Sequence, residues 1–106
     1  MASLQGADLR GVKLQGANLT QTDFQGANLI DTDLQGANLF GTNLKEVEDL
    51  TPVQIKTTLN WEWAFYSTDF LKELGLPPDH NEKLSSRLAG REKASAARER
   101  KSEGAK

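Results

Sequence analysis

Residues 6–40 read GADLR-GVKLQ-GANLT-QTDFQ-GANLI-DTDLQ-GANLF, and the fourth residue of every block of five is leucine or phenylalanine. The same spacing begins at Leu4 and continues to Leu44, and the residue two places earlier is always alanine, valine or threonine. An α-helix returns to the same face every 3.6 residues and a strand every two residues, so a period of five fits neither. The pattern therefore predicts a chain that turns a corner every five residues.

Each block predicts which of its side chains are inside the molecule. The pair Ala7 and Leu9 is expected to point inward. Asp8 between them then points outward, and Arg10 and Gly11 form the turn to the next side. Four such sides close a coil of 20 residues, and stacked coils pair their backbone groups at the β spacing of about 4.8 Å. Self-similarity at a fixed period is typical of solenoids, so we expect an all-β solenoid.

The 20-residue coil predicts which residues stack on each other. One inner column is expected to contain Leu4, Phe24 and Leu44. On the outside, Lys13 is expected beside Asp33. Thr32 falls at an inner position, where its hydroxyl needs a backbone acceptor because a buried unpaired polar group costs about 1 to 3 kcal/mol.

Four of the blocks also carry a recognisable consensus. Residues 6–10, 16–20, 26–30 and 36–40 resemble the A(D/N)LXX motif of the pentapeptide-repeat proteins, and the resemblance spans residues 2–46. It implies a right-handed quadrilateral β-helix. Nine repeats would make about two coils, stacked to a height of about 11 Å.

The repeat loses its phase after Leu44. The next apolar position would be Asp49, but the leucine arrives one residue late at Leu50, so the solenoid is predicted to stop near residue 46. An open end of a solenoid exposes apolar side chains and unpaired backbone groups. We therefore expect residues 47–78 to form a helical C-terminal cap.

Three helical stretches are predicted within this cap. The run Thr51-Pro52-Val53-Gln54 contains an N-cap threonine, a proline at the first helical position and a capping-box glutamine, and this helix should reach about Leu59. A second stretch should run from Asn60 to Tyr66. A third should cover residues 69–74, with Ser67 or Thr68 as the N-cap and with Gly75, Pro77 and Pro78 at its end.

The cap is also similar to a known segment. Residues 50–56, 60–62 and 64–67 look like the helical C-terminal segment that follows the repeats in many cyanobacterial pentapeptide-repeat proteins. The likeness implies no catalytic residue.

Residues 79–106 contain few large apolar side chains and are expected to form a solvated tail that is disordered or partly helical. His80 should be exposed there, and a lone histidine without ligand-type neighbours predicts neither a metal site nor a general base. A basic arm for an acidic partner or a membrane surface is the functional alternative, because residues 79–106 carry eight basic and five acidic groups.

Composition excludes several classes of function. The chain of 106 residues has no cysteine, which excludes thiol chemistry and fits the cytoplasm. No run is long and apolar enough for a membrane span, and the repeat starts at once with no signal segment. The net charge of −2 argues against direct nucleic-acid binding. No motif predicts a cofactor, a metal, a small-molecule substrate or catalysis.

Four apolar side chains are candidates for binding a partner. Ile30 and Phe40 stand at outward positions where polar residues are expected, and we expect residues 51–75 to cover at least one of them. Trp61 and Trp63 belong to an aromatic cluster that is either the core of the cap or a binding site. If Ile30 and Phe40 are both exposed, they become the best candidate patch.

The sequence therefore predicts a non-catalytic scaffold or protein–protein interaction module. Some members of the family imitate DNA and bind type II topoisomerases, but a solenoid of about two coils with three basic and five acidic groups in residues 1–46 is short and weakly acidic for that role. The chain is alternatively a fragment of a longer repeat protein. A homodimer through the open solenoid end is also compatible with the pattern.

Overall fold

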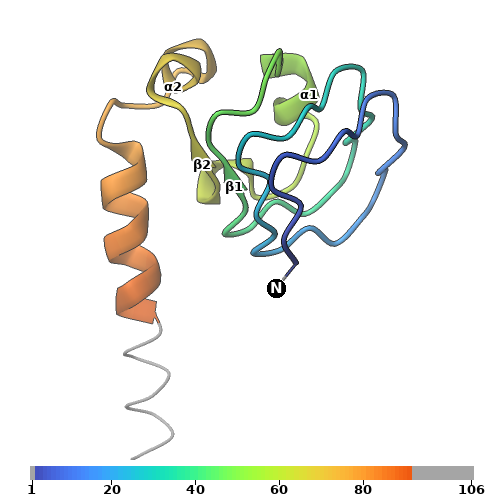
Figure 1. Cartoon of the computed structure of the whole chain (residues 1–106). Coiled ribbons are helices and arrows are strands. Elements are labelled where there is room, and N and C mark those ends of the chain that lie inside the picture. The colour runs from blue at the N-terminus through green and yellow to red at the C-terminus, as the bar shows by residue number, and fades with distance from the viewer. Residues whose placement is uncertain (1, 92–106) are drawn as a thin grey trace, which may run out of the picture.

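The computed structural model describes residues 2–91 and has a β-helix-type solenoid at its N-terminal side (Figure 1). Parallel β-bridges join residues 20 apart in the sequence, which confirms the predicted register. The bridged pairs are Ser3 with Asp23, Asp8 with Asn28, Lys13 with Asp33, Asn18 with Asn38, and Asp23 with Asn43. Backbone hydrogen bonds such as Leu9 N to Asn28 O, 2.9 Å long, follow these bridges.

The chain turns at the first residue of each block. Every such residue from Gly6 to Glu46 has a positive φ, including the non-glycine residues Gln21 and Asp31. The central Asp or Asn of a block helps to hold the turn, because its side-chain oxygen accepts a hydrogen bond from the backbone N–H two residues later, as Asn28 does from Ile30 at 3.1 Å. The turn therefore accounts for the recurrence of either Asp or Asn at this position.

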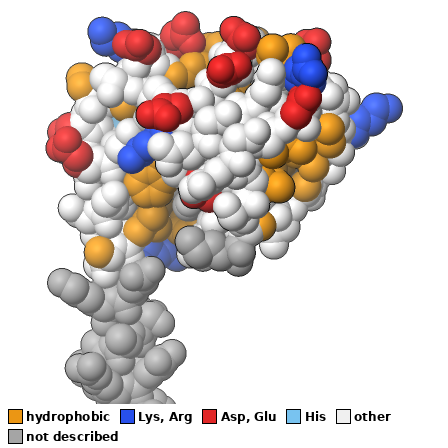
Figure 2. All heavy atoms as spheres, viewed as in Figure 1, with side chains coloured by type: hydrophobic (Ala, Val, Ile, Leu, Met, Phe, Trp, Pro, Cys, Tyr) orange, Lys and Arg blue, Asp and Glu red, His pale blue; other side chains and the backbone are white. Residues whose placement is uncertain are grey.

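The core is the inner row of large side chains. Phe24, Leu29 and Leu39 are fully buried. Thr32 is buried as predicted, and its hydroxyl donates to Leu9 O at 2.7 Å, which supplies the expected backbone acceptor. The first coil is less well covered, because Leu4, Leu9 and Leu14 are only partly buried. Figure 2 shows hydrophobic side chains gathered over this N-terminal part of the solenoid.

The five-residue spacing of the leucines ends near residue 46, but the parallel backbone pairing continues beyond it. Strand β1 (Asn43–Leu44) pairs in parallel with strand β2 (Phe65–Tyr66), and bridges join Asn28 to Glu48 and Asn38 to Leu59. Residues 57–66 thus form ladder bonds with the last repeats.

The predicted helices are partly correct. Helix α1 (Pro52–Lys56) has the predicted capping box at Thr51 but ends three residues before Leu59. The helix predicted from Asn60 to Tyr66 is wrong: only the 3₁₀ turn η1 (Trp61–Trp63) forms, and β2 follows it. The backbone of Phe65 is needed for pairing with β1, which competes with helix formation.

Helix α2 (Thr68–Leu74) confirms the third stretch, with Ser67 as its N-cap and Gly75 at its end. Gly75 has a φ of 78°, in the left-handed region that glycine favours.

A further helix occupies residues 80–91 and stands beside the solenoid (Figure 1). It corrects the expectation of a solvated start to the tail, since His80 is buried and Leu84 is only 2% exposed. The remaining part of the predicted tail, residues 92–106, lies outside the described residues, and the division of the chain at residues 46 and 78 stays a prediction.

Candidate partner-binding surface

Phe40 and Trp63 lie against each other on the surface beside the 80–91 helix. Their ring centroids are 5.4 Å apart, and both side chains are partly buried. The backbone brings them together, because Gly41 N donates to Trp63 O at 2.7 Å. Phe40 is thus partly covered by the segment 51–75, as predicted.

A cation covers this aromatic pair. The Arg91 Cζ atom lies 5.1 Å from the centroid of Phe40 and 5.6 Å from that of Trp63. A guanidinium over an aromatic face stabilises the arrangement by about 0.5 to 1 kcal/mol at an exposed site. The contact joins the C-terminal part of the described chain to the outer face of the solenoid.

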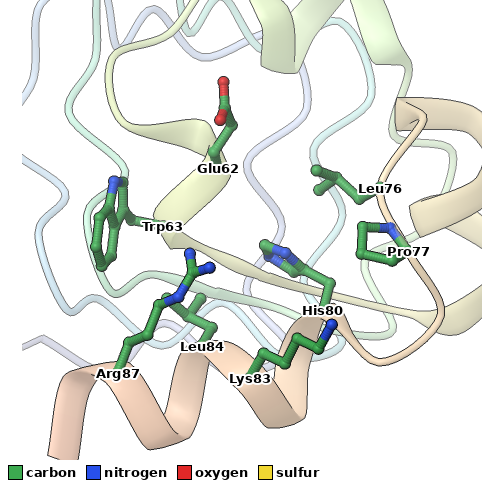
Figure 3. Close-up of a pocket in the computed structure, with 8 residues that line it drawn as sticks. All are labelled: Glu62, Trp63, Leu76, Pro77, His80, Lys83, Leu84 and Arg87. Carbon is green, nitrogen blue, oxygen red and sulfur yellow. The ribbon is translucent and has the colours of Figure 1, made fainter. Parts of the chain in front are cut away.

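A pocket of about 310 Å³ lies next to Trp63, between η1 and the 80–91 helix. Its apolar wall consists of Trp63, Leu76, Pro77 and Leu84, and its charged residues are Glu62, Lys83 and Arg87. Figure 3 shows Lys83 and Arg87 rising from the helix, and Glu62 on the opposite side of the pocket. Together with Phe40 and Arg91, these residues form what we call the aromatic–cation surface.

His80 also lines the pocket, at the start of the helix. Its Nε2 lies 2.9 Å from Ala64 O. Since a carbonyl oxygen only accepts, Nε2 must carry the proton and donate it. The prediction of an exposed His80 is therefore wrong, and the ring fastens the helix to the backbone that precedes β2.

Asn81 makes a second attachment. Its Nδ2 donates to Tyr66 O at 2.6 Å and its Oδ1 accepts from Tyr66 N at 3.1 Å. In a parallel pair, successive residues direct their backbone groups to opposite sides. Phe65 N bonds to Thr42 O on the solenoid side, so the Tyr66 groups face away from β1, where Asn81 takes the place of a further strand.

Tyr66 supports the floor beneath η1. The side chain is fully buried and its hydroxyl donates to Trp61 O at 2.6 Å. Burial disfavours the charged phenolate and raises the pKa of Tyr66 well above its ordinary value, and the carboxylate of Glu62 adds to the shift. This tyrosine is a structural group rather than an acid or base for chemistry at neutral pH.

Two carboxylates on the solenoid have shifted pKa values because of hydrogen bonds within the repeats. The guanidinium of Arg10, bonded to Asp8 at 2.8 Å, lowers the pKa of that carboxyl and has its own pKa raised in turn. The pKa of Asp23 is lowered by hydrogen bonds from Gln25 N and from the side chains of Gln5 and Asn43. These carboxylates serve turns and ladders.

The four predicted binding residues do not form one site. Phe40 and Trp63 are in contact, and Trp61 lies on the same 3₁₀ turn with its side chain packed on the core. Ile30 lies elsewhere, partly buried in a groove that Val53 of α1 also lines.

Sequence reasoning missed the contribution of the helix. Lys83, Arg87 and Arg91 recur every four residues, a spacing that places side chains on one helix face. The spacing can be seen in the sequence. The position of that face beside Trp63 depends on the hydrogen bonds of His80 to Ala64 and of Asn81 to Tyr66.

Neither metal chemistry nor a membrane helix is indicated in residues 2–91. No group of three His, Cys, Asp or Glu side chains in this range is arranged to hold a metal ion. No helix in the described part of the chain is both long enough and apolar enough to cross a bilayer.

The family model for pentapeptide repeats matches residues 2–41 in eight copies, so this part of the chain consists of pentapeptide repeats. A search of the curated proteins found no match. The predicted likeness of the C-terminal segment to cyanobacterial members of the family falls outside the matched residues and stays a prediction.

Proposed function

We propose that the chain is a non-catalytic pentapeptide-repeat module that binds a partner protein through the aromatic–cation surface. The observation that carries the proposal is the stacked set of Phe40, Trp63 and Arg91 beside a pocket with an apolar wall. Aromatic and arginine side chains are enriched where protein interfaces gain most of their binding energy. In this arrangement the solenoid is the rigid support for the binding surface. The cytoplasm remains the predicted location of the protein.

A non-catalytic role agrees with the use of the polar repeat residues. The Asp and Asn side chains of the blocks accept hydrogen bonds within their own turns, for example at Asn18, Asn38 and Asn43. They are therefore engaged in forming the scaffold. The alternative of DNA mimicry is not favoured, because residues 1–46 carry only five acidic against three basic groups.

We further propose the finer architecture that the family resemblance implies. The solenoid is then a right-handed quadrilateral β-helix of about two coils, and residues 47–78 are its cap. A turn at every fifth residue and bridges between residues 20 apart support four sides per coil. The pairing of β1 with β2 and the hydrogen bond from Leu39 N to Leu59 O support the cap.

Site-directed photo-crosslinking tests the binding surface. Benzoylphenylalanine replaces Glu62 in one variant and Lys13, on the outer face of the solenoid, in the control. Irradiation in the cells that produce the chain is expected to give a protein adduct of defined mass from position 62 that disappears when Trp63→Ala is added. Absence of an adduct at 62, or equal adducts at both positions, would reject this surface.

Self-association through the first described coil is a second proposal, because Leu4, Leu9 and Leu14 are partly exposed whereas Leu29 and Leu39 are fully buried. Light scattering after size exclusion is expected to show a dimer that Leu9→Glu dissociates. A monomer at high protein concentration would count against it.

A further inference from the structure

The 80–91 helix carries a regular row of cations. Lys83, Arg87 and Arg91 are four residues apart, so their Cα atoms are about 6 Å apart along the helix axis. Lys83 pairs with Asp79 at 3.2 Å, whereas Arg87 and Arg91 have no carboxylate partner among residues 2–91. Arg91 is stacked on Phe40 and Trp63, and a stacked guanidinium still presents N–H donors at its edge.

The rest of the described chain makes this row unusual. Residues 1–79 contain five basic and eleven acidic side chains, a net charge of −6, whereas residues 80–91 contain three basic and one acidic side chain, a net charge of +2. A nucleic acid or an anionic membrane in contact with residues 2–79 would meet net repulsion there. A short acidic segment of a protein would contact only the 80–91 helix and the residues beside it, where the net charge of the helix is positive.

The pocket adds a requirement for an apolar side chain. Its volume of about 310 Å³ is at the lower limit of ligand pockets, which suits one side chain better than a whole ligand. Trp63 and Leu84 lie beside Arg87, whereas Leu76 and Pro77 lie on the other side of His80 (Figure 3). An apolar residue and acidic residues of one segment therefore fit side by side.

We infer that the aromatic–cation surface binds an extended acidic peptide segment of the partner protein. Alternate residues of an extended chain are about 6.6 Å apart, close to the 6 Å step of the cation row. Carboxylates at alternate positions then pair with the cations, and one apolar side chain enters the pocket. This inference rests on the proposed function and adds the chemistry of the partner. Glu62 on the far side of the pocket repels carboxylates, which directs the segment toward the helix.

Fluorescence anisotropy with two labelled heptapeptides and the full chain tests the inference. One peptide has leucine first, glutamate at its third, fifth and seventh positions, and alanine elsewhere, and the other has the reverse order. At least one of the two peptides is expected to bind. The same peptides with lysine in place of glutamate are expected not to bind. Arg87→Glu is expected to weaken binding about tenfold, because an attraction becomes a repulsion. Glu62→Gln is expected to strengthen it about twofold.

Lys72→Glu is the matched control, since Lys72 is an exposed residue on α2 that does not line the pocket. It should leave the affinity unchanged, and near-ultraviolet circular dichroism verifies that each variant folds. An equal loss with Arg87→Glu and Lys72→Glu, or no binding of either peptide, would overturn the inference. Preferential binding to phosphatidylserine vesicles or to single-stranded RNA would overturn it as well. A crosslinked partner at position 62 without peptide binding would leave the proposed function in place and remove only this inference.

Discussion

The side-chain amide of Asn81 pairs with both backbone groups of Tyr66, with its Nδ2 donating to the carbonyl and its Oδ1 accepting from the N–H. One side chain thereby replaces the neighbour that the outer edge of β2 lacks. An unpaired edge is open to pairing with other chains. The contact therefore both attaches the 80–91 helix and closes the ladder.

Replacement of Asn81 by alanine is expected to lower the free energy of unfolding by about 1 to 3 kcal/mol, because two partly buried backbone groups lose their partner. Hydrogen exchange of the Tyr66 amide should become faster by a larger factor than exchange in the solenoid core. Ser85→Ala on the same helix is the control, since Ser85 is exposed. Unchanged exchange at Tyr66 in Asn81→Ala would contradict the assigned role.

Gln21 has a φ of 58° at a corner where most blocks have glycine. A non-glycine residue in the left-handed region costs about 1 to 2 kcal/mol, and glycine avoids this cost. Glycine in turn loses about 0.5 to 1 kcal/mol on folding, because its backbone has more freedom in the unfolded chain. Gln21→Gly is therefore expected to stabilise the chain by about 0.5 to 1 kcal/mol. Denaturant unfolding measures the change.

The converse substitution is the control for this prediction. An added Cβ at Gly26 would meet no heavy atom within 4 Å, so Gly26→Ala isolates the conformational cost of its φ of 73°. It should destabilise the chain. Stabilisation by Gly26→Ala, or destabilisation by Gln21→Gly, would show that corner conformation does not govern these sites.

Tyr66 is the only tyrosine of the chain, so its ionisation can be followed by absorbance. Its pKa is raised by burial in the folded state, whereas the unfolded state titrates near pH 10. Above about pH 10 the folded state holds more protons than the unfolded state. The contribution of Tyr66 to the free energy of unfolding is therefore fully present below this pH and is lost as the pH rises. Phenolate absorbance should appear only together with unfolding. Ionisation of Tyr66 near pH 10 in a chain that is still folded would contradict the burial.

Arg91 and Phe40 are expected to be energetically coupled. A double-mutant cycle with Phe40→Ala and Arg91→Ala should give a coupling free energy of about 0.5 to 1 kcal/mol in thermal or denaturant unfolding. Arg87→Ala combined with Phe40→Ala serves as the comparison, because no cation–π contact joins Arg87 to Phe40 among the described residues. Additive effects for the Arg91 pair would show that the stacking contributes nothing measurable.

The solenoid was predictable because one local rule is repeated in every block. The inner leucines and the inner position of Thr32 follow from the period of five. The bridges between residues 20 apart follow from that period together with the four-sided coil that the family resemblance implied. The contact of Phe40 with the following segment was also predicted. The indication was an apolar residue, Phe40, at an outward position of the repeat where a polar residue is expected.

The second half was less predictable because its structure depends on distant contacts. Phe65 and Tyr66 lie in a segment that reads as a helix, yet they pair with β1. His80 is buried because its ring reaches the carbonyl of Ala64, sixteen residues earlier. The local sequence around residue 80, rich in proline and charge, carries no sign of that acceptor.

The 20-residue register also determines how the chain tolerates changes in length. An added segment of 20 residues returns each later residue to the same position around the solenoid axis, so Trp63 would still meet the side on which Phe40 lies. A block of five residues inserted between Phe40 and Trp63 would shift the C-terminal segment by one corner and separate it from that side. Growth of the repeat region by whole coils thus lengthens the support while preserving the orientation of the aromatic–cation surface, whereas smaller insertions change what the surface faces.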